Sequence, residues 1–310
     1  MTRWPGNGVS WPAVTPGPRE NNSDFPALEE GAGSLYYASL KEMGIREESE
    51  GAGPPWKPAP ARPALAGREV HVWRIELDRA PARVEDLSHV LSPDEEHRAA
   101  RFYFQKDRDH YTVARASLRL ILALYLEKDP KELTFSYSPY GKPSLASRDP
   151  DKDLRFNLSH SGHLALAGVT FGLDIGIDVE RVREDFASEE IAQRFFSARE
   201  VACLRSLPEG GRAQAFFHCW TRKEAYIKAR GEGLSMPLDK FDVAFAPGEA
   251  PALLGTRIDP REVERWSILD IAIDPGYAAA LAVEGHGLHM EYWEQGPVAG
   301  GQEPRRETDS

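Results

Sequence analysis

Three short stretches of this chain place carboxylates, lysines and a histidine beside apolar residues that predict burial. They are residues 156–162 (FNLSHSG), 176–180 (GIDVE) and 220–228 (WTRKEAYIK). Charged side chains near a core are usually paired, bound to a metal or used in chemistry. These stretches are therefore the first candidates for a functional site.

Two of the carboxylates, Asp178 and Glu180, lie two residues apart in a sequence that predicts a strand. Residues two apart in a strand point to the same face, so the two side chains project together. Like charges at this spacing repel unless a cation bridges them. Mg²⁺ prefers oxygen ligands and keeps waters that a phosphate can replace, so it is the natural bridge. The alternative is an exposed strand end with solvated acids.

Glu224 and Lys228 are four residues apart in a predicted helix and therefore share one face. An exposed pair of this kind contributes only about 0.2–0.5 kcal/mol. The same helix carries large aromatic residues, so much of it must be buried. Its basic residues reverse the local charge of an acidic protein, as expected around a bound phosphate, although a solvated helix face remains an equal alternative. These basic residues are Arg222, Lys223, Lys228 and Arg230.

Ser159 and His160 follow an apolar strand. They do not suit a Ser–His nucleophile pair, because adjacent strand residues point to opposite faces. The histidine is either a structural hydrogen-bonding residue or, with the neighbouring hydroxyl and glycine, a phosphate contact. Gly141, Lys142 and Pro143 predict a turn whose lysine is either exposed or within reach of a nucleotide. The chain has no Walker sequence and no GxGxxG.

Composition narrows the class of protein. The chain has 310 residues, of which 41% are hydrophobic, enough for a substantial core. Its net charge of −11 argues against non-specific binding to nucleic acid and against electrostatic docking on an anionic membrane. Cys203 and Cys219 form no metal-ligand or disulfide pattern, the first residues lack the basic-then-apolar pattern of a signal peptide, and there is no run of eighteen apolar residues. We therefore expect a cytoplasmic location.

Periodicity and capping signals predict an α+β fold between two atypical ends. Residues 1–67 are rich in Pro and Gly and are expected to be disordered or linker-like, with one short helix within 34–47; residues 296–310 form a tail. Strands are expected at 70–75, 133–137, 154–158, 164–170, 175–180, 242–245, 266–273 and 277–283. Helices are expected at 92–104, 107–127, 188–196, 197–207 and 212–230. Helices followed by strands occur twice, which indicates a duplicated unit.

The motifs, taken in order, resemble a known family. Gly-Lys-Pro, Phe-Asn-x-Ser-His-Ser-Gly, Gly-Ile-Asp-x-Glu, Phe-Ser-x-x-Glu and Trp-x-x-Lys-Glu-x-x-x-Lys are similar to those of the 4′-phosphopantetheinyl transferases, specifically the large Sfp-type class. The resemblance covers roughly residues 70–285. It implies a pseudo-dimer of two similar α+β halves, residues 68–173 and 174–295, with the active site between them. The second half would carry the metal site.

The resemblance also implies a reaction of the holo-[acyl-carrier-protein] synthase type. Phosphopantetheine would move from coenzyme A to a serine of an acyl or peptidyl carrier protein, releasing adenosine 3′,5′-bisphosphate. Asp178, Glu180 and Glu224 would hold Mg²⁺ with the coenzyme A pyrophosphate. Glu224 would be the base, or a water held by Glu200 would serve instead. Lys228 would neutralise charge on the leaving phosphate.

Nucleotide contacts follow from the same resemblance. Ser159 and His160 would contact the nucleotide and its 3′-phosphate, and Gly141, Lys142 and Pro143 would frame the adenine. Lys223 is counted among the coenzyme contacts because of its place in the basic helix. Arg98 lies where relatives place a basic residue for the 3′-phosphate. Some relatives have a second lysine where this chain has Glu95, so phosphate recognition would depend more on Arg98 and His160.

Two other functions fit parts of this pattern. Paired acids followed by Glu and Lys also suit a Mg²⁺-dependent nuclease, although the acidic balance and the lack of a basic, aromatic groove argue against one. A non-catalytic protein that binds coenzyme A or a carrier is the second alternative, and the intact acidic and basic set argues against it. We expect a monomer with no nucleic-acid or membrane partner.

Overall fold

The computed structural model describes residues 56–146 and 153–296, which belong to one compact unit that begins at Pro54. The α-helices are α2 (Pro81–Ser88), α3 (Pro93–Ala100), α4 (Gln105–Leu126), α5 (Glu189–Phe195), α6 (Ala198–Ser206), α7 (Glu209–Arg230) and α8 (Glu262–Arg265). The strands are β1 (Lys57–Pro58), β2 (Glu69–Glu76), β3 (Phe135–Tyr137), β4 (Pro143–Leu145), β5 (Leu154–Ser161), β6 (Leu164–Phe171), β7 (Ile175–Arg181), β8 (Phe241–Val243), β9 (Leu253–Thr256), β10 (Trp266–Asp270), β11 (Tyr277–Glu284) and β12 (His289–Glu294). Short 3₁₀ turns occupy Pro130–Glu132, Gly233–Ser235 and Leu238–Lys240.

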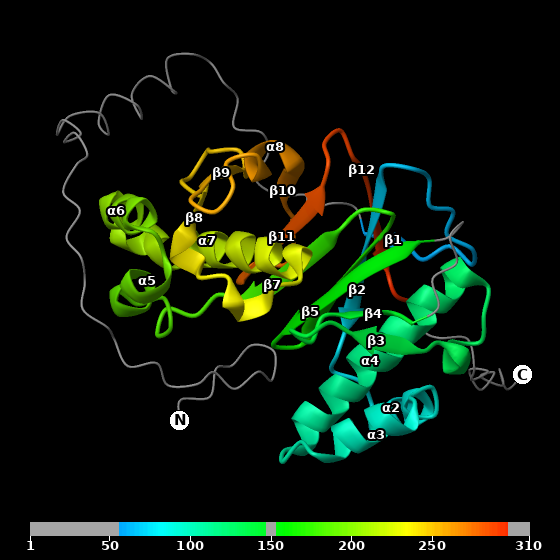
Figure 1. Cartoon of the computed structure of the whole chain (residues 1–310). Coiled ribbons are helices and arrows are strands. Elements are labelled where there is room, and N and C mark those ends of the chain that lie inside the picture. The colour runs from blue at the N-terminus through cyan, green and yellow to red at the C-terminus, as the bar shows by residue number, and fades with distance from the viewer. Residues whose placement is uncertain (1–55, 147–152, 297–310) are drawn as a thin grey trace, which may run out of the picture. The chain divides into compact units, whose positions relative to one another are not determined.

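The first half is built on a five-stranded sheet with the order β1-β12-β2-β6-β5. Strands β2, β6 and β5 pair antiparallel, whereas β12 joins β2 in parallel. Helix α4 covers one face of this sheet, with α2 and α3 packed beside it (Figure 1). Trp73, Ile75 and Phe156 pack there against Leu118 and Leu122, so alternate strand residues form this core.

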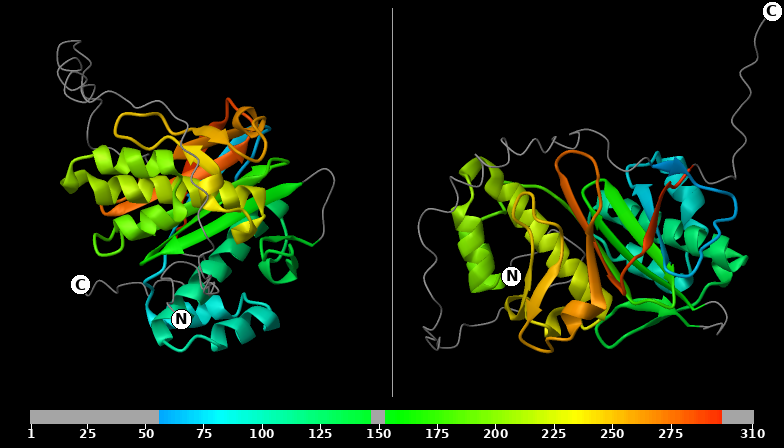
Figure 2. Two further views of the ribbon diagram at one scale, coloured as in Figure 1. Left: turned by 60° about the vertical axis from the view of Figure 1, so that its left-hand side comes forward. Right: turned by 90° about the horizontal axis from the view of Figure 1, so that it is seen from above.

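The second half is built on a three-stranded antiparallel sheet with the order β10-β11-β7. Helix α7 packs across β7 and β11, and α5 and α6 lie beside it. The two sheets meet face to face through a second core that includes Val70, Leu166 and Ile177. Figure 2 shows the resulting order of layers, with helices of the second half, two sheets, and then helices of the first half.

The two halves repeat the same local arrangement. Helices α3 and α6 each begin with a capping box, Ser92 with Glu95 and Ser197 with Glu200. Both glutamates are 1% exposed, and each pairs with the long helix that follows. Glu95 pairs with Arg119, the fifteenth residue of the 22-residue α4, and Glu200 pairs with Lys223, the fifteenth residue of the 22-residue α7. The duplicated α+β fold is therefore confirmed.

Several predicted elements need correction. Helices α2 and α8 and strands β1, β4, β9 and β12 were not predicted. The short helix expected within 34–47 lies outside the described residues, as does most of the extension 1–67 and the tail after 296. Lys57 and Pro58 pair with β12, so the part of that extension that is described joins the fold. Strand β12 belongs to the sheet of the first half, so the boundary at residue 174 does not separate the halves completely.

Helix length raises the question of membrane insertion. Within residues 56–146 and 153–296, no helix is both long enough and apolar enough to span a bilayer. The two longest helices, α4 and α7, carry many charged residues and pack on the sheets.

Candidate active site

The close approach of α7 to β7 builds the site, and Gly176 permits it. A Cβ at Gly176 would lie 2.1 Å from the Ala225 carbonyl oxygen and 2.2 Å from the Ala229 nitrogen. The helix backbone therefore rests directly on the strand at this point. Asp178 and Glu180 follow Gly176 at intervals of two and share its face, while Glu224 and Lys228 flank the contact on the helix.

Asp178 is the centre of the cluster. It is 1% exposed, and its Oδ1 accepts hydrogen bonds from Lys228 Nζ at 2.6 Å and from Ser159 Oγ at 2.9 Å. Lys228 Nζ also donates to Ser159 Oγ at 2.9 Å. Burial raises the pKa of Asp178, and the ammonium of Lys228 and the hydroxyl of Ser159 oppose that rise. The other oxygen of this carboxylate, Oδ2, has no hydrogen-bond partner.

Glu180 and Glu224 add two further half-buried carboxylates. Burial raises the pKa of Glu180 to about 8, with repulsion from Asp178 adding to the effect and a hydrogen bond from Ser161 Oγ at 2.6 Å opposing it. Burial also raises the pKa of Glu224 to about 7, again with a contribution from Asp178. Glu224 Oε1 is buried and has no hydrogen-bond partner. Three carboxylates thus share a single ammonium.

This donor set fits a hard divalent cation. Buried polar atoms are normally hydrogen-bonded, and each exception needs an explanation. The buried oxygens of Asp178 and Glu224 that lack hydrogen-bond partners, together with the raised pKa values of the three carboxylates, fit the ligands of a divalent cation. Oxygen ligands alone favour Mg²⁺ over a transition metal.

Three side chains of β5 join the first half to this strand. Asn157 Oδ1 accepts from the Ile177 amide at 2.9 Å, Ser159 Oγ accepts from the Val179 amide at 3.4 Å, and Ser161 Oγ accepts from the Arg181 amide at 3.1 Å. Alternate side chains of one strand therefore satisfy alternate amides along the edge of the other. Ser159 and Ser161 also contact Asp178 and Glu180, so the seam between the halves orients the acidic pair.

Glu200 and Lys223 lie outside the cluster, which departs from the roles predicted for them. Glu200 Oε1 accepts from Lys223 Nζ at 2.6 Å and from the Val243 amide at 2.9 Å, and its Oε2 accepts from the Ser197 amide. Lys223 is 0% exposed and also donates to the Phe241 carbonyl at 2.6 Å. Glu200 and Lys223 neutralise each other and bond backbone groups of the second half, so we assign them a structural role.

Ser159 and His160 point to opposite sides of β5. Ser159 is 1% exposed and belongs to the acidic cluster, whereas His160 lies on the face covered by α4. Burial lowers the pKa of His160 to about 4, and the nearby charge of Lys228 adds to the effect. His160 is therefore a neutral imidazole near pH 7. The two side chains therefore lie on opposite faces of β5, and their contact with a nucleotide stays a prediction.

Lys142 connects the first half to the end of α7. Its Nζ donates to the Ala229 carbonyl at 2.8 Å and to the Ile175 carbonyl at 3.0 Å, and burial lowers its pKa to about 8. Gly141 occupies the preceding turn with a φ of 85°, which favours glycine, and Pro143 begins β4. The ammonium of Lys142 thus bonds one carbonyl in the last turn of α7 and one carbonyl of β7.

The remaining basic residues divide into exposed and internal ones. Arg98 is exposed on α3, with its guanidinium 5.7 Å from the centre of the Tyr111 ring. Arg222 pairs with Asp270, and Arg230 pairs with Glu262 at 2.6 Å. Of the four basic residues of α7, Lys228 is the one that donates to the acidic cluster, and the other three pair with carboxylates elsewhere.

Sequence reasoning missed three contributors to the site: Gly176, Asn157 and Ser161. Gly176 was noted only as part of a motif, although a glycine inside an apolar strand signals a close backbone approach. Asn157, Ser159 and Ser161 alternate with apolar residues along β5. That alternation of polar residues could have predicted a strand edge bonded through side chains.

Comparisons with known proteins agree with this architecture. Residues 174–282 match the family described as the 4′-phosphopantetheinyl transferase superfamily, and residues 80–170 match 4′-phosphopantetheinyl transferase, N-terminal. The chain is 42% identical over 238 residues to the 4′-phosphopantetheinyl transferase HetI of Nostoc sp., covering 77% of this chain and 97% of that protein. It is 31% identical over 214 residues to the 4′-phosphopantetheinyl transferase Sfp of Bacillus subtilis, covering 68% of this chain and 90% of that protein.

Similarity to solved structures is weaker. Holo-[acyl-carrier-protein] synthase of Helicobacter pylori in complex with coenzyme A aligns with 36% of this chain and 99% of its own, at 20% identity and a TM-score of 0.30. The assignment therefore depends on the sequence relatives. The fold is that of a two-half transferase, and the chain belongs to the 4′-phosphopantetheinyl transferase superfamily.

Proposed function

We propose that this protein transfers 4′-phosphopantetheine from coenzyme A to a serine of a carrier protein and releases adenosine 3′,5′-bisphosphate. Mg²⁺ would be held by Asp178, Glu180 and Glu224. The observation that carries the proposal is the set of three carboxylates around Lys228, with buried oxygens of Asp178 and Glu224 left without hydrogen bonds. When bound, Mg²⁺ would neutralise the pyrophosphate and the developing charge on its oxygens.

Glu224 is the residue best suited to remove the proton from the attacking serine. A general base works best when its pKa lies near the working pH. The pKa of Glu224 is raised to about 7, and one of its oxygens is unused. Glu200 is less suited to this role, because its side-chain oxygens bond Lys223 and the amides of Ser197 and Val243.

Lys228 stabilises the leaving phosphate. Its side chain is 18% exposed, so the ammonium is held in the cluster yet still open to a substrate. Hydrogen bonds to Asp178 and Ser159 fix its position before the substrate arrives. Phosphoryl transfer depends mainly on positioning and on neutralising charge, which a fixed ammonium supplies.

Nucleotide recognition is assigned to Arg98 and His160. Arg98 is exposed and would bind the 3′-phosphate, for which a guanidinium is well shaped. His160 is neutral near pH 7 and would act as a hydrogen-bond donor. Lys142 would contribute indirectly, by holding the turn at Gly141 and Pro143 against α7.

The acceptor we propose is an acyl or peptidyl carrier protein. The reaction would then be of the holo-[acyl-carrier-protein] synthase type. Both halves of the fold lie in one chain and meet at the acidic cluster, so a monomer would be active. A cytoplasmic location would suit an enzyme that uses coenzyme A, and both cysteines are free thiols.

Release of adenosine 3′,5′-bisphosphate tests the proposal. The protein is incubated with coenzyme A, Mg²⁺ and apo-carrier proteins from several pathways, and the nucleotide product is followed by chromatography. We expect product only when both coenzyme A and an apo-carrier are present. A parallel incubation with DNA tests the nuclease alternative. Cleavage of DNA without bisphosphate release would refute the transferase assignment.

A further inference from the structure

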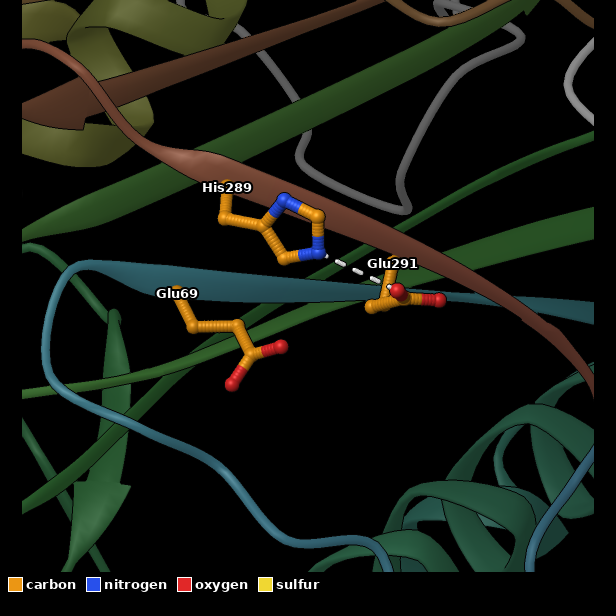
Figure 3. A group of neighbouring side chains, drawn as sticks. All are labelled: Glu69, His289 and Glu291. Carbon is orange, nitrogen blue, oxygen red and sulfur yellow. Dashed lines mark hydrogen bonds and ion pairs between the residues drawn. The ribbon is translucent and has the colours of Figure 1, made fainter.

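Four metal-binding side chains lie on one face of the sheet, away from the acidic cluster. Strands β2 and β12 pair in parallel with Glu69 opposite His289 and His71 opposite Glu291. Residues two apart on a strand share a face, so the four side chains form a two-by-two grid of carboxylates and imidazoles. Ligand atoms of Glu69, His289 and Glu291 all lie within 4.8 Å of one another (Figure 3).

Each carboxylate of the grid has one oxygen bonded to a donor outside the grid and one oxygen that faces an imidazole. Glu69 Oε2 accepts from the Ala66 amide at 2.7 Å, and Glu291 Oε2 accepts from Lys57 Nζ at 2.9 Å. The opposite oxygens face imidazoles. Glu291 Oε1 lies 3.1 Å from His289 Nε2, and Glu69 Oε1 lies 3.5 Å from His71 Nε2. Donors outside the grid thus orient both carboxylates, and the inner oxygens face the imidazoles of the grid, as second-shell contacts orient ligands in metal sites.

His71 supplies the independent indication of a ligand. It is 1% exposed, and its Nε2 has no hydrogen-bond partner. Its Nδ1 lies 2.7 Å from the Tyr125 hydroxyl oxygen, which also accepts from Trp73 Nε1 at 2.8 Å. In the tautomer that carries its proton on Nδ1, this nitrogen donates a hydrogen bond to the Tyr125 hydroxyl and Nε2 presents a lone pair on the side of Glu69. A metal-binding histidine typically has this arrangement, with its other nitrogen held by a hydrogen bond.

We propose that Glu69, His71, His289 and Glu291 form a binding site for a divalent transition-metal ion of the Zn²⁺ type. Two imidazoles and two carboxylates match the tetrahedral nitrogen and oxygen coordination of zinc, at about 2.0–2.2 Å per ligand. Imidazole ligands select Zn²⁺ over Mg²⁺. The ion would join β12 to β2 and so fasten the last strand of the second half to the sheet of the first.

This site differs from the transferase cluster in position and in chemistry. Glu69 and His71 share the face of the sheet on which Trp73 packs toward α4, whereas Asp178 lies on the other sheet beside α7. The transferase cluster offers oxygen ligands alone. Binding of Zn²⁺ at the grid should therefore persist in millimolar Mg²⁺ and should not depend on Asp178.

Calorimetric titration of the full chain with ZnCl₂ in excess Mg²⁺ tests the site, and Co²⁺ absorption reports its geometry. We expect one ion per chain, a tetrahedral Co²⁺ spectrum, and a higher unfolding temperature with Zn²⁺. His289 is exposed, so His289→Ala should fold while losing at least about 100-fold in Zn²⁺ affinity. Glu291→Gln should behave similarly.

Two controls make the result specific. His97→Ala removes an exposed histidine outside the grid and should bind Zn²⁺ as the parent protein does. Asp178→Asn alters the transferase cluster and should also retain Zn²⁺ binding. Equal affinity in the parent protein and in His289→Ala, an octahedral Co²⁺ spectrum, or loss of binding in Asp178→Asn would overturn the proposal, as would the absence of binding at micromolar Zn²⁺.

Discussion

Binding of Mg²⁺ to the acidic cluster should release protons, and the number can be worked out from the raised pKa values. Without the metal, Glu180 has a pKa of about 8 and Glu224 a pKa of about 7. At pH 7.5 Glu180 would be about 0.76 protonated and Glu224 about 0.24. Because Mg²⁺ binds the ionised carboxylates, its binding should release at least about one proton. At pH 9 the two carboxylates would be almost fully ionised, and the binding of Mg²⁺ should release only about 0.1 proton from them.

Isothermal titration calorimetry measures this number directly. Mg²⁺ is titrated into the protein at pH 7.5 in buffers with different ionisation enthalpies, and the slope of heat against ionisation enthalpy gives the protons released. The apparent affinity should rise about tenfold per pH unit near 7.5 and level off towards pH 9. Glu190→Gln is a matched control, since it removes an exposed glutamate outside the cluster.

A release near zero at pH 7.5, with an affinity that stays constant from pH 6.5 to 9, would refute the reasoning. It would mean that the three carboxylates are already ionised in the metal-free protein. The protons released come from carboxylates that interact with one another, so the measured number describes the cluster as a whole. Glu180→Gln should lower the release at pH 7.5 towards the smaller contribution of Glu224.

Further predictions concern stability and the contact between the halves. Glu180 and Glu224 have pKa values raised above the ordinary 4.5, so the metal-free protein should lose thermal stability as pH rises from about 5 to 8, and Mg²⁺ should restore it. Glu200→Gln should lower the free energy of unfolding by about 3–5 kcal/mol, because Lys223 stays buried without its partner. It should leave kcat of the folded fraction unchanged, and a large fall in kcat would restore Glu200 to the catalytic site. Gly176→Ala should displace α7 and reduce both transfer activity and Mg²⁺ affinity; unchanged values would contradict the close packing.

The sequence predicted that Asp178, Glu180, Glu224 and Lys228 form pairs on shared faces, because the geometry of each pair is local. Asp178 and Glu180 share a face by the two-residue period of a strand, and Glu224 and Lys228 share a face by the helical period. Only the approach of α7 to β7 was needed to join the pairs, and Gly176 permits that approach. The capping boxes at Ser92 and Ser197 were predictable for the same reason, since three residues contain the whole signal.

Contacts between distant segments could not be predicted in this way. Lys142 reads as an exposed turn residue, yet it caps the end of α7, and Glu200 reads as an acid near the metal, yet Lys223 neutralises it. Strand β12 mixes polar and aromatic residues without a clear alternation, and nothing local indicates that it pairs with β2. In each case the partner lies far away in the sequence, so only the folded structure shows which residues are in contact.

The duplication explains why only one half carries the chemistry. Glu95 and Arg119 occupy the places in the first half that Glu200 and Lys223 occupy in the second. The α4 residues that correspond to Glu224 and Lys228 are Leu120 and Leu124, both of which pack against the core of the first half. The structural ion pair is therefore shared by both halves, while the proposed metal ligands belong to the second.

Intact-mass spectrometry of an apo-carrier protein tests the central claim most directly. The carrier is incubated with coenzyme A and Mg²⁺ in the presence of the parent protein, Asp178→Asn, Glu224→Gln or Glu190→Gln. The account predicts that the parent protein and Glu190→Gln add one phosphopantetheine group to the carrier serine, and that Asp178→Asn and Glu224→Gln, although folded, add none. Equal modification by all four proteins, or modification in excess EDTA, would contradict it.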